Sequence, residues 1–154
     1  MKKSTYILLF VICFYSCNNY PKTPPTDFNF FFRFGIFDDH INTIDSTYTQ
    51  DNKTIKIAFT KGELQRIYKT LADNDYLSLP DNFPEKAMGV PHDSYILEVF
   101  ANGKKKYVCL DDRFDEFTTD NKSLKFMHIS DTITRILYSK KEYQQLPKTL
   151  RLAE

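Results

Sequence analysis

The sequence is short of the residues that most often mark an enzyme or a metal site. It has four glycines and no Gly-x-Ser-x-Gly segment, which argues against the nucleophile elbow of α/β-hydrolases. Its three histidines are too few for a histidine-rich zinc site. Lys and Arg (21) balance Asp and Glu (20) without forming a long basic block, so nucleic acid is not an expected partner. No catalytic motif remains to indicate a reaction.

The longest apolar run is also too short to cross a bilayer. Residues 6–15 (YILLFVICFY) are all apolar, whereas a membrane-spanning helix needs about 20 such residues. Lys2 and Lys3 precede the run and small Ser16 follows it, which is the order of parts in a secretory signal peptide. We therefore expect residues 1–16 to be a signal peptide.

Cys17 stands directly after this leader, and Phe14-Tyr15-Ser16-Cys17 resembles the lipobox of bacterial lipoproteins. That family's pattern is Leu, then Ala or Ser, then Gly or Ala, then Cys; small Ser16 and Cys17 fit it, whereas Phe14 and Tyr15 depart from it. The resemblance covers only the leader and implies that acyl chains, palmitate among them, are attached to the Cys17 thiol. More than one chain anchors a protein stably, because a single chain binds only marginally. A protein secreted after cleavage near Cys17, or an uncleaved anchor, is the alternative.

The residues after the leader predict a tether followed by one domain. Residues 17–27 carry three prolines and almost no aliphatic side chain, which favours an extended spacer. Asn18, in place of Asp, follows Cys17, and the sorting rule of enteric lipoproteins then favours the outer membrane. The expected location is the cell envelope, with the protein lipid-anchored to a membrane and either periplasmic or surface-exposed. Residues 28–154 suit a single domain that needs neither a metal nor a disulfide to fold.

Cysteine is scarce in that domain. Cys13 lies in the leader and Cys17 is the expected lipid site, so Cys109 is left alone. Its apolar neighbours, Tyr107 to Leu110, favour burial as a small apolar residue. A disulfide between Cys17 and Cys109 stays open only if Cys17 carries no lipid.

Alternating phenylalanines predict a core strand near the start of the domain. Side chains at every second position share one face of a strand. One face would carry Phe28, Phe30, Phe32, Phe34 and Ile36, and the other Asn29, Phe31, Arg33, Gly35 and Phe37. Phe31 and Phe37 would be exposed unless another segment, such as the tail after Pro147, covers them.

The remaining pattern predicts an α+β fold. Strands are expected over 43–49 and 54–60, with a turn at 38–40. The capping box Thr60-x-x-Glu63 starts a helix that ends near residue 73, and residues 76–80 are expected to be extended. Asn102-Gly103 joins strands 94–101 and 104–111 in a type I′ hairpin. A second helix spans about 120–140. The order strand-strand-strand-helix-strand-strand-helix predicts a single antiparallel sheet of about five strands with both helices on one face.

Three polar clusters are candidate sites, each with a simpler interpretation. Asp38-Asp39-His40 offers two carboxylates and an imidazole to a divalent ion, but adjacent residues in a turn rarely face one centre. His92-Asp93, before Ser94, could supply the base half of a catalytic triad. Because the sequence has no nucleophile elbow, the simpler interpretation is an ordinary pair of loop residues. His128 is expected at the boundary of the second helix's apolar stripe, hydrogen bonded locally.

The acidic segment 111–116 is the fourth candidate. Calcium prefers oxygen-rich loops, but the EF-hand spacing and its central glycine are absent and Arg113 offsets part of the charge. We expect a solvated loop before the second helix, where acids are favoured, and no bound metal or cofactor. The acids that could instead meet a protein partner are Asp111, Asp112, Asp115 and Glu116.

The sequence leaves three functions open. The favoured one is a non-catalytic binding or accessory domain, tethered to an envelope membrane through lipid on Cys17 and contacting a protein partner through Phe31, Arg33 and Phe37 or through loop 81–93. The alternative is an immunity or inhibitor lipoprotein that blocks a toxin or hydrolase in the periplasm with its acidic 111–120 loop. The third, an enzyme of unfamiliar type, would need residues 38–40, His92 and the 111–116 acids to converge.

Overall fold

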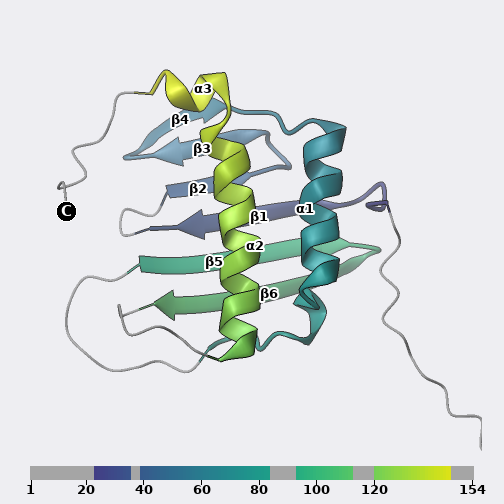
Figure 1. The fold of residues 1–154 in the computed structure, drawn as a ribbon. Helices are drawn as coiled ribbons and strands as arrows, with labels where there is room; N and C mark the ends of the chain where they lie inside the picture. The colour runs from purple at the N-terminus through teal and green to yellow at the C-terminus, as the bar shows by residue number, and fades with distance from the viewer. Residues whose placement is uncertain (1–22, 36–38, 84–92, 113–119, 147–154) are drawn as a thin grey trace, which may run out of the picture.

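The computed structural model describes residues 23–35, 39–83, 93–112 and 120–146, which form an α+β domain of two layers. One layer is a six-stranded antiparallel sheet with the strand order β4-β3-β2-β1-β5-β6. The other layer is α1 and α2, which lie side by side across one face of the sheet (Figure 1). The predicted fold class and layer arrangement are confirmed, with six strands in place of about five.

The alternating phenylalanines form β1, Asn29–Phe34, an inner strand of the sheet. Phe30, Phe32 and Phe34 are buried, whereas the residues between them are half-buried, as the alternation predicted. Phe30 and Phe32 expose 1% and 0% of their surface, so they form the centre of the core between sheet and helices. Ile36 and Phe37 lie outside the described residues.

The segment after β1 differs from the prediction. Asp39 and His40 do not form a turn but begin β2, Asp39–Asn42; residues 43–46 form a turn, and β3 (Thr47–Gln50) and β4 (Lys53–Lys56) follow. The buried Tyr48 hydroxyl donates a hydrogen bond of 2.9 Å to the Asp39 carboxylate. This contact gives Asp39 Oδ2 a donor inside the fold, which offsets part of the cost of an acidic side chain at a buried strand position.

The β5–β6 hairpin matches its predicted turn and register. β5 (Asp93–Ala101) and β6 (Lys104–Asp112) are joined by Asn102 and Gly103, whose φ values of 54° and 68° are those of a type I′ turn. Leu97 pairs with Val108, and Ile96 with Cys109, as the two-residue turn required.

α1 begins with the capping box that the sequence predicts, and α2 begins with an aspartate cap. In α1, Lys61–Asp73, the Glu63 N–H donates to Thr60 Oγ1 (3.3 Å) and the Thr60 N–H donates to Glu63 Oε2 (2.7 Å). In α2, Asn121–Tyr138, the Asp120 carboxylate accepts from the Lys122 N–H at 2.8 Å. Apolar stripes then pack the helices onto the sheet with buried Ile67, Tyr68 and Leu71 from α1 and Phe126, Ile129, Ile133, Ile136 and Leu137 from α2.

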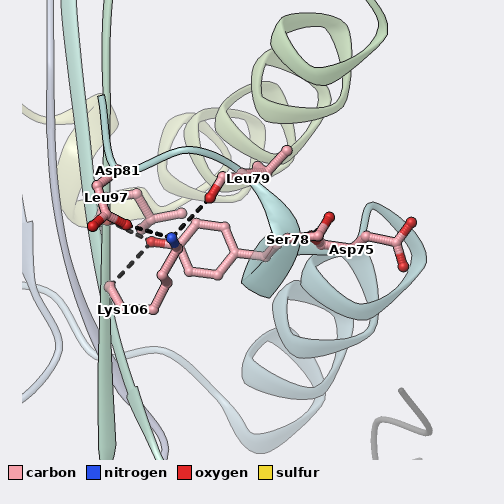
Figure 2. A network of polar contacts seen from close by, with 7 residues as sticks. Asp75, Ser78, Leu79, Asp81, Leu97 and Lys106 are labelled. Carbon is pink, nitrogen blue, oxygen red and sulfur yellow. Dashed lines mark hydrogen bonds and ion pairs between the residues drawn. The ribbon is translucent and has the colours of Figure 1, made fainter. Parts of the chain in front are cut away.

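A polar clasp joins the exit of α1 to the sheet (Figure 2). Tyr76–Ser78 is a short 3₁₀ helix and not the predicted extended segment. The Tyr76 hydroxyl donates to the Leu97 carbonyl at 2.5 Å. Lys106 Nζ donates to the Leu79 carbonyl (2.8 Å) and to the Asp81 carboxylate (2.5 Å). Because these bonds cross from the helix layer to β5 and β6, they fix the spacing of the layers on this side.

Two short segments complete the described domain. Residues 81–83 run along the outer edge of β6, where the Cys109 N–H donates to the Asp81 carbonyl (2.8 Å) and the Phe83 N–H donates to the Cys109 carbonyl (3.0 Å). After α2, α3 (Lys141–Gln144) lies near β3 and β4, where the rings of Tyr143 and Tyr48 are 5.4 Å apart (Figure 1). Leu146 also packs against the core, and residues 147–154 lie outside the described part.

Candidate interaction surface

One face of the sheet is covered by α1 and α2, and no helix or strand in residues 23–35, 39–83, 93–112 and 120–146 covers the other. We call this second face the open face. Phe31 lies on it with its register partners Asn42 of β2 and Glu98 of β5. Arg33 lies on it in the next row, between His40 and Ile96. Paired residues of an antiparallel sheet point to the same side, which fixes these assignments.

The open face is more apolar than a purely solvated sheet face would be. Phe31 is half-buried and its ring lies 5.5 Å from the imidazole of His40. Phe100, at the end of β5, exposes 36% of its surface, and Ile44, in the β2–β3 turn, exposes 71%. A hollow of about 590 Å³ with mostly apolar walls lies here; it is lined by Phe31, Ile44 and Phe100 together with Asn29, Asn42, Glu98, Val99 and Lys105.

The charged groups of this face are arranged across strands. Lys105 Nζ and Glu98 Oε2 form an ion pair of 2.5 Å beside the hollow. Burial raises the pKa of Tyr107, and its hydrogen bond with the Cys109 side chain raises it further, while the Arg33 guanidinium acts in the opposite direction. Tyr107 is therefore a neutral hydrogen-bonding group at neutral pH, next to the cationic Arg33.

Two turns border the hollow, and local hydrogen bonds hold both. The Asn42 side chain donates to the Asp45 carboxylate at 2.9 Å and accepts from the Ile44 N–H at 3.0 Å, which fixes the β2–β3 turn. The Asp27 carboxylate accepts from the N–H groups of Asn102 (2.9 Å) and Gly103 (2.8 Å) in the β5–β6 turn. These backbone donors hold the pKa of Asp27 below its usual range, and the Gly103 N–H has the larger effect. The apolar side chains at the turns are thus carried on ordered backbone.

The structure separates the candidate metal ligands that it describes. Asp39 is buried on the helix side of β2 and accepts from Tyr48, whereas His40 lies on the open face beside Phe31. The two side chains therefore face opposite sides of the sheet and do not share a centre. His128 is exposed on α2. Among the residues whose side chains are described, no three His, Cys, Asp or Glu side chains gather in a way that would hold a metal ion.

Several predicted positions are not among the described ones. Cys17, Asp38, His92, Arg113, Asp115 and Glu116 lie outside the described residues, and of Asp93, Asp111 and Asp112 only the backbone, in β5 and β6, is described. Cys109, expected to be buried, is half-buried on the open face. No helix in the described ranges is both long and apolar enough to cross a bilayer.

The chain matches no known protein-family model and no curated protein. The residues of the open face therefore have to be interpreted from their own chemistry.

Sequence reasoning named Phe31 and Arg33 on this surface but missed the residues at its rim. The pattern does not single out Phe100 or Ile44, although the Asn102-Gly103 turn fixes the strand register. In that register Phe100 shares a face with Ile96, which alternation along β5 could have shown. Ile44 carried no such signal, because its exposure depends on a turn that the sequence pattern placed inside a strand.

Proposed function

We propose that this protein is a membrane-tethered lipoprotein of the cell envelope whose domain acts as a non-catalytic binding module. The observation that carries the proposal is the open face, on which Phe31, Ile96 and Phe100 lie without a covering element among the described residues. Exposed aromatic clusters rimmed by polar groups are characteristic of protein-binding surfaces. Aromatic and Arg side chains at the centre of such a surface contribute most of the binding energy.

The envelope part of the proposal is supported by the leader and spacer. Residues 1–16 have the order of a signal peptide, Cys17 follows in a lipobox-like setting, and residues 17–27 are rich in proline. The anchor is tested by measuring the mass and membrane partition of the mature protein and of Cys17→Ala. An acyl-sized mass gain at residue 17, with membrane attachment lost in the variant, supports the anchor. An unmodified protein that partitions like the variant rules it out.

The binding part is tested by site-specific photocrosslinking in the native cell. A benzophenone amino acid at position 31 should form a protein adduct, and the same group at Leu124, an exposed apolar residue of α2, serves as the matched control. Arg33→Gln should weaken the adduct from position 31, and a melting temperature close to that of the wild type shows that the loss does not come from unfolding. Equal adducts from both positions, or none from position 31, contradict a partner at the open face.

The identity of the adduct separates the two kinds of binding module. An adduct with a toxin or hydrolase whose activity falls when the purified domain is added supports the inhibitor alternative. An adduct with a structural or transport protein of the envelope supports an accessory role.

A further inference from the structure

The end of the sheet at which the chain enters the domain carries exposed apolar side chains and an exposed lysine. Asn29, at the start of β1, pairs with Phe100, so the chain entry and the β5–β6 turn lie at the same end of the sheet (Figure 1). Ile44 lines the same hollow as Phe100 and exposes 71% of its surface, more than any other large apolar residue among those described. Lys104, at the first position of β6, is exposed at the same end, but its pairing with Ala101 places it on the helix side of the sheet. We call Ile44, Phe100 and Lys104 the turn rim.

The chain entry is fixed to this rim. Asp27 accepts hydrogen bonds from the backbone of Asn102 and Gly103, which hold residue 27 beside the β5–β6 turn. Asp27 stands ten positions after Cys17 in the sequence. A fully extended spacer of that length reaches at most about 35 Å. A lipid on Cys17 would therefore keep residue 27 and the neighbouring turn rim within about 35 Å of the bilayer.

The chemistry of the rim suits phospholipid headgroups. Exposed Ile and Phe side chains bury their surface at the boundary between headgroups and acyl chains, and each buried CH₂ contributes about 0.8 kcal/mol. Lys side chains place their ammonium at phosphate level while their stems stay in the apolar zone. Of the carboxylates nearby, Glu98 is offset by its ion pair with Lys105, whereas Asp45 and Asp27 accept hydrogen bonds from neutral amide groups. The ion pair reduces the repulsion between Glu98 and a negatively charged surface.

We propose that the turn rim lies against the phospholipid surface of the membrane that carries the anchor. The inference rests on the proposed lipid at Cys17 for the location of the domain, but it concerns contacts that the anchor does not make. In this orientation the strands run roughly along the membrane normal, so Phe31 and Arg33 lie further from the lipid than Ile44 and Phe100. A partner of the open face would then have to stand at the membrane surface itself.

The absence of tryptophan allows a direct test, because one substitution creates a single reporter. Phe100→Trp and, as the matched control, Leu124→Trp are prepared in the mature lipidated protein; Leu124 exposes 56% of its surface on α2. The probes are vesicles of phosphatidylethanolamine and phosphatidylglycerol with brominated acyl chains. We expect the bromines to lower the emission of Phe100→Trp roughly twofold, with a blue shift, because the ring enters the interface. Emission of Leu124→Trp should stay unchanged.

Further variants locate the contact. Ile44→Ser in the Phe100→Trp background should reduce the quenching, and Lys104→Glu should reduce it more in vesicles rich in phosphatidylglycerol than in vesicles without it. Unquenched Phe100→Trp, or equal quenching of both reporters, overturns the proposal. If a protein and not lipid covers the rim in the cell, Phe100→Trp stays unquenched in these vesicles, which contain no protein partner.

Failure of the anchor is distinguishable from failure of the rim contact. The mass of each reporter protein shows whether Cys17 is acylated. If it is not, the reporters are prepared with Cys109→Ser and coupled through Cys17 to a maleimide lipid in the same vesicles. The comparison of Phe100→Trp with Leu124→Trp then decides the rim contact alone, with the same two overturning results.

Discussion

Lys140 ties the end of α2 to the start of α1, and removing its ammonium tests how much one shielded cation stabilises the fold. Nζ donates to the Ala58 carbonyl (2.9 Å) and to Glu63 Oε2 (2.5 Å), and it lies 5.1 Å from the centre of the Phe59 ring. The Lys140 and Glu63 side chains expose only 11% and 26% of their surface. Lys140→Met keeps the apolar stem and deletes these three contacts together.

The expected cost is about 2 kcal/mol. A hydrogen bond to a charged group contributes about 1.5–3 kcal/mol, and a cation–π contact about 0.5–1 kcal/mol. The sum is reduced because Glu63 keeps its hydrogen bond from the Thr60 N–H at 2.7 Å and is partly open to water. Urea unfolding at pH 7 measures the loss as a lower midpoint with an unchanged m-value. The matched control is Lys69→Met, whose partner Asp73 and own side chain are 57% and 71% exposed, and it should cost about 0.5 kcal/mol or less.

Acidification provides a second readout of the same contact. Burial by itself raises the pKa of Glu63, but hydrogen bonds from Lys140 and Thr60 outweigh it and hold the pKa below its usual range. The stabilisation is therefore present above the ordinary glutamate pKa and is lost as pH falls through the lowered folded value. The difference in the free energy of unfolding between wild type and Lys140→Met should therefore narrow as pH falls from the ordinary glutamate pKa through the lowered pKa of Glu63. Equal costs for Lys140→Met and Lys69→Met at pH 7 would refute the reasoning.

Three further predictions concern contacts that cross between elements. Asp27→Asn should lower the free energy of unfolding at neutral pH, and the difference should shrink as pH falls through the lowered Asp27 pKa, measured by urea unfolding at several pH values; a pH-independent difference contradicts the carboxylate's role. Tyr76→Phe should cost about 1–2 kcal/mol in the same assay, because the buried Leu97 carbonyl loses its hydroxyl donor; no loss would show that the bond is dispensable. Thr60→Ala should cost about 1 kcal/mol and speed amide exchange in the first turn of α1 only, whereas uniform exchange would contradict a local cap.

Local chemistry was enough to predict most of the fold. The strict alternation of β1 fixed which phenylalanines are buried, since a strand repeats every second residue. Asn102 and Gly103 adopt left-handed φ values at low cost, so they fixed both the turn and the pairing of β5 with β6. Thr60 and Glu63 marked the first turn of α1, because their side chains accept hydrogen bonds from backbone N–H groups that have no partner within the helix.

The failures lie where a distant residue decides the local structure. Asp39 can occupy a buried strand position because Tyr48, nine positions later, donates its hydroxyl to Asp39 Oδ2, and no sequence periodicity displays such a contact. The 3₁₀ turn at Tyr76 follows Asp75, which has a left-handed φ of 50°, and it places the Tyr76 hydroxyl on the distant carbonyl of Leu97. The candidate surface shows the same division: Phe31 and Arg33 follow from alternation, whereas Ile44 depends on how the β2–β3 turn closes.

The two edges of the sheet differ, and this limits how copies of the chain can join. At the β6 edge, Cys109 has both backbone groups engaged by residues 81–83, which interrupts any continuous ladder with a second molecule. At the other edge, β4 offers four residues with Lys53 and Lys56 at its ends, and no described segment pairs beyond it. Growth of a fibre by backbone pairing requires two usable edges per copy. Pairing through the described strands would then stop at two molecules joined at β4.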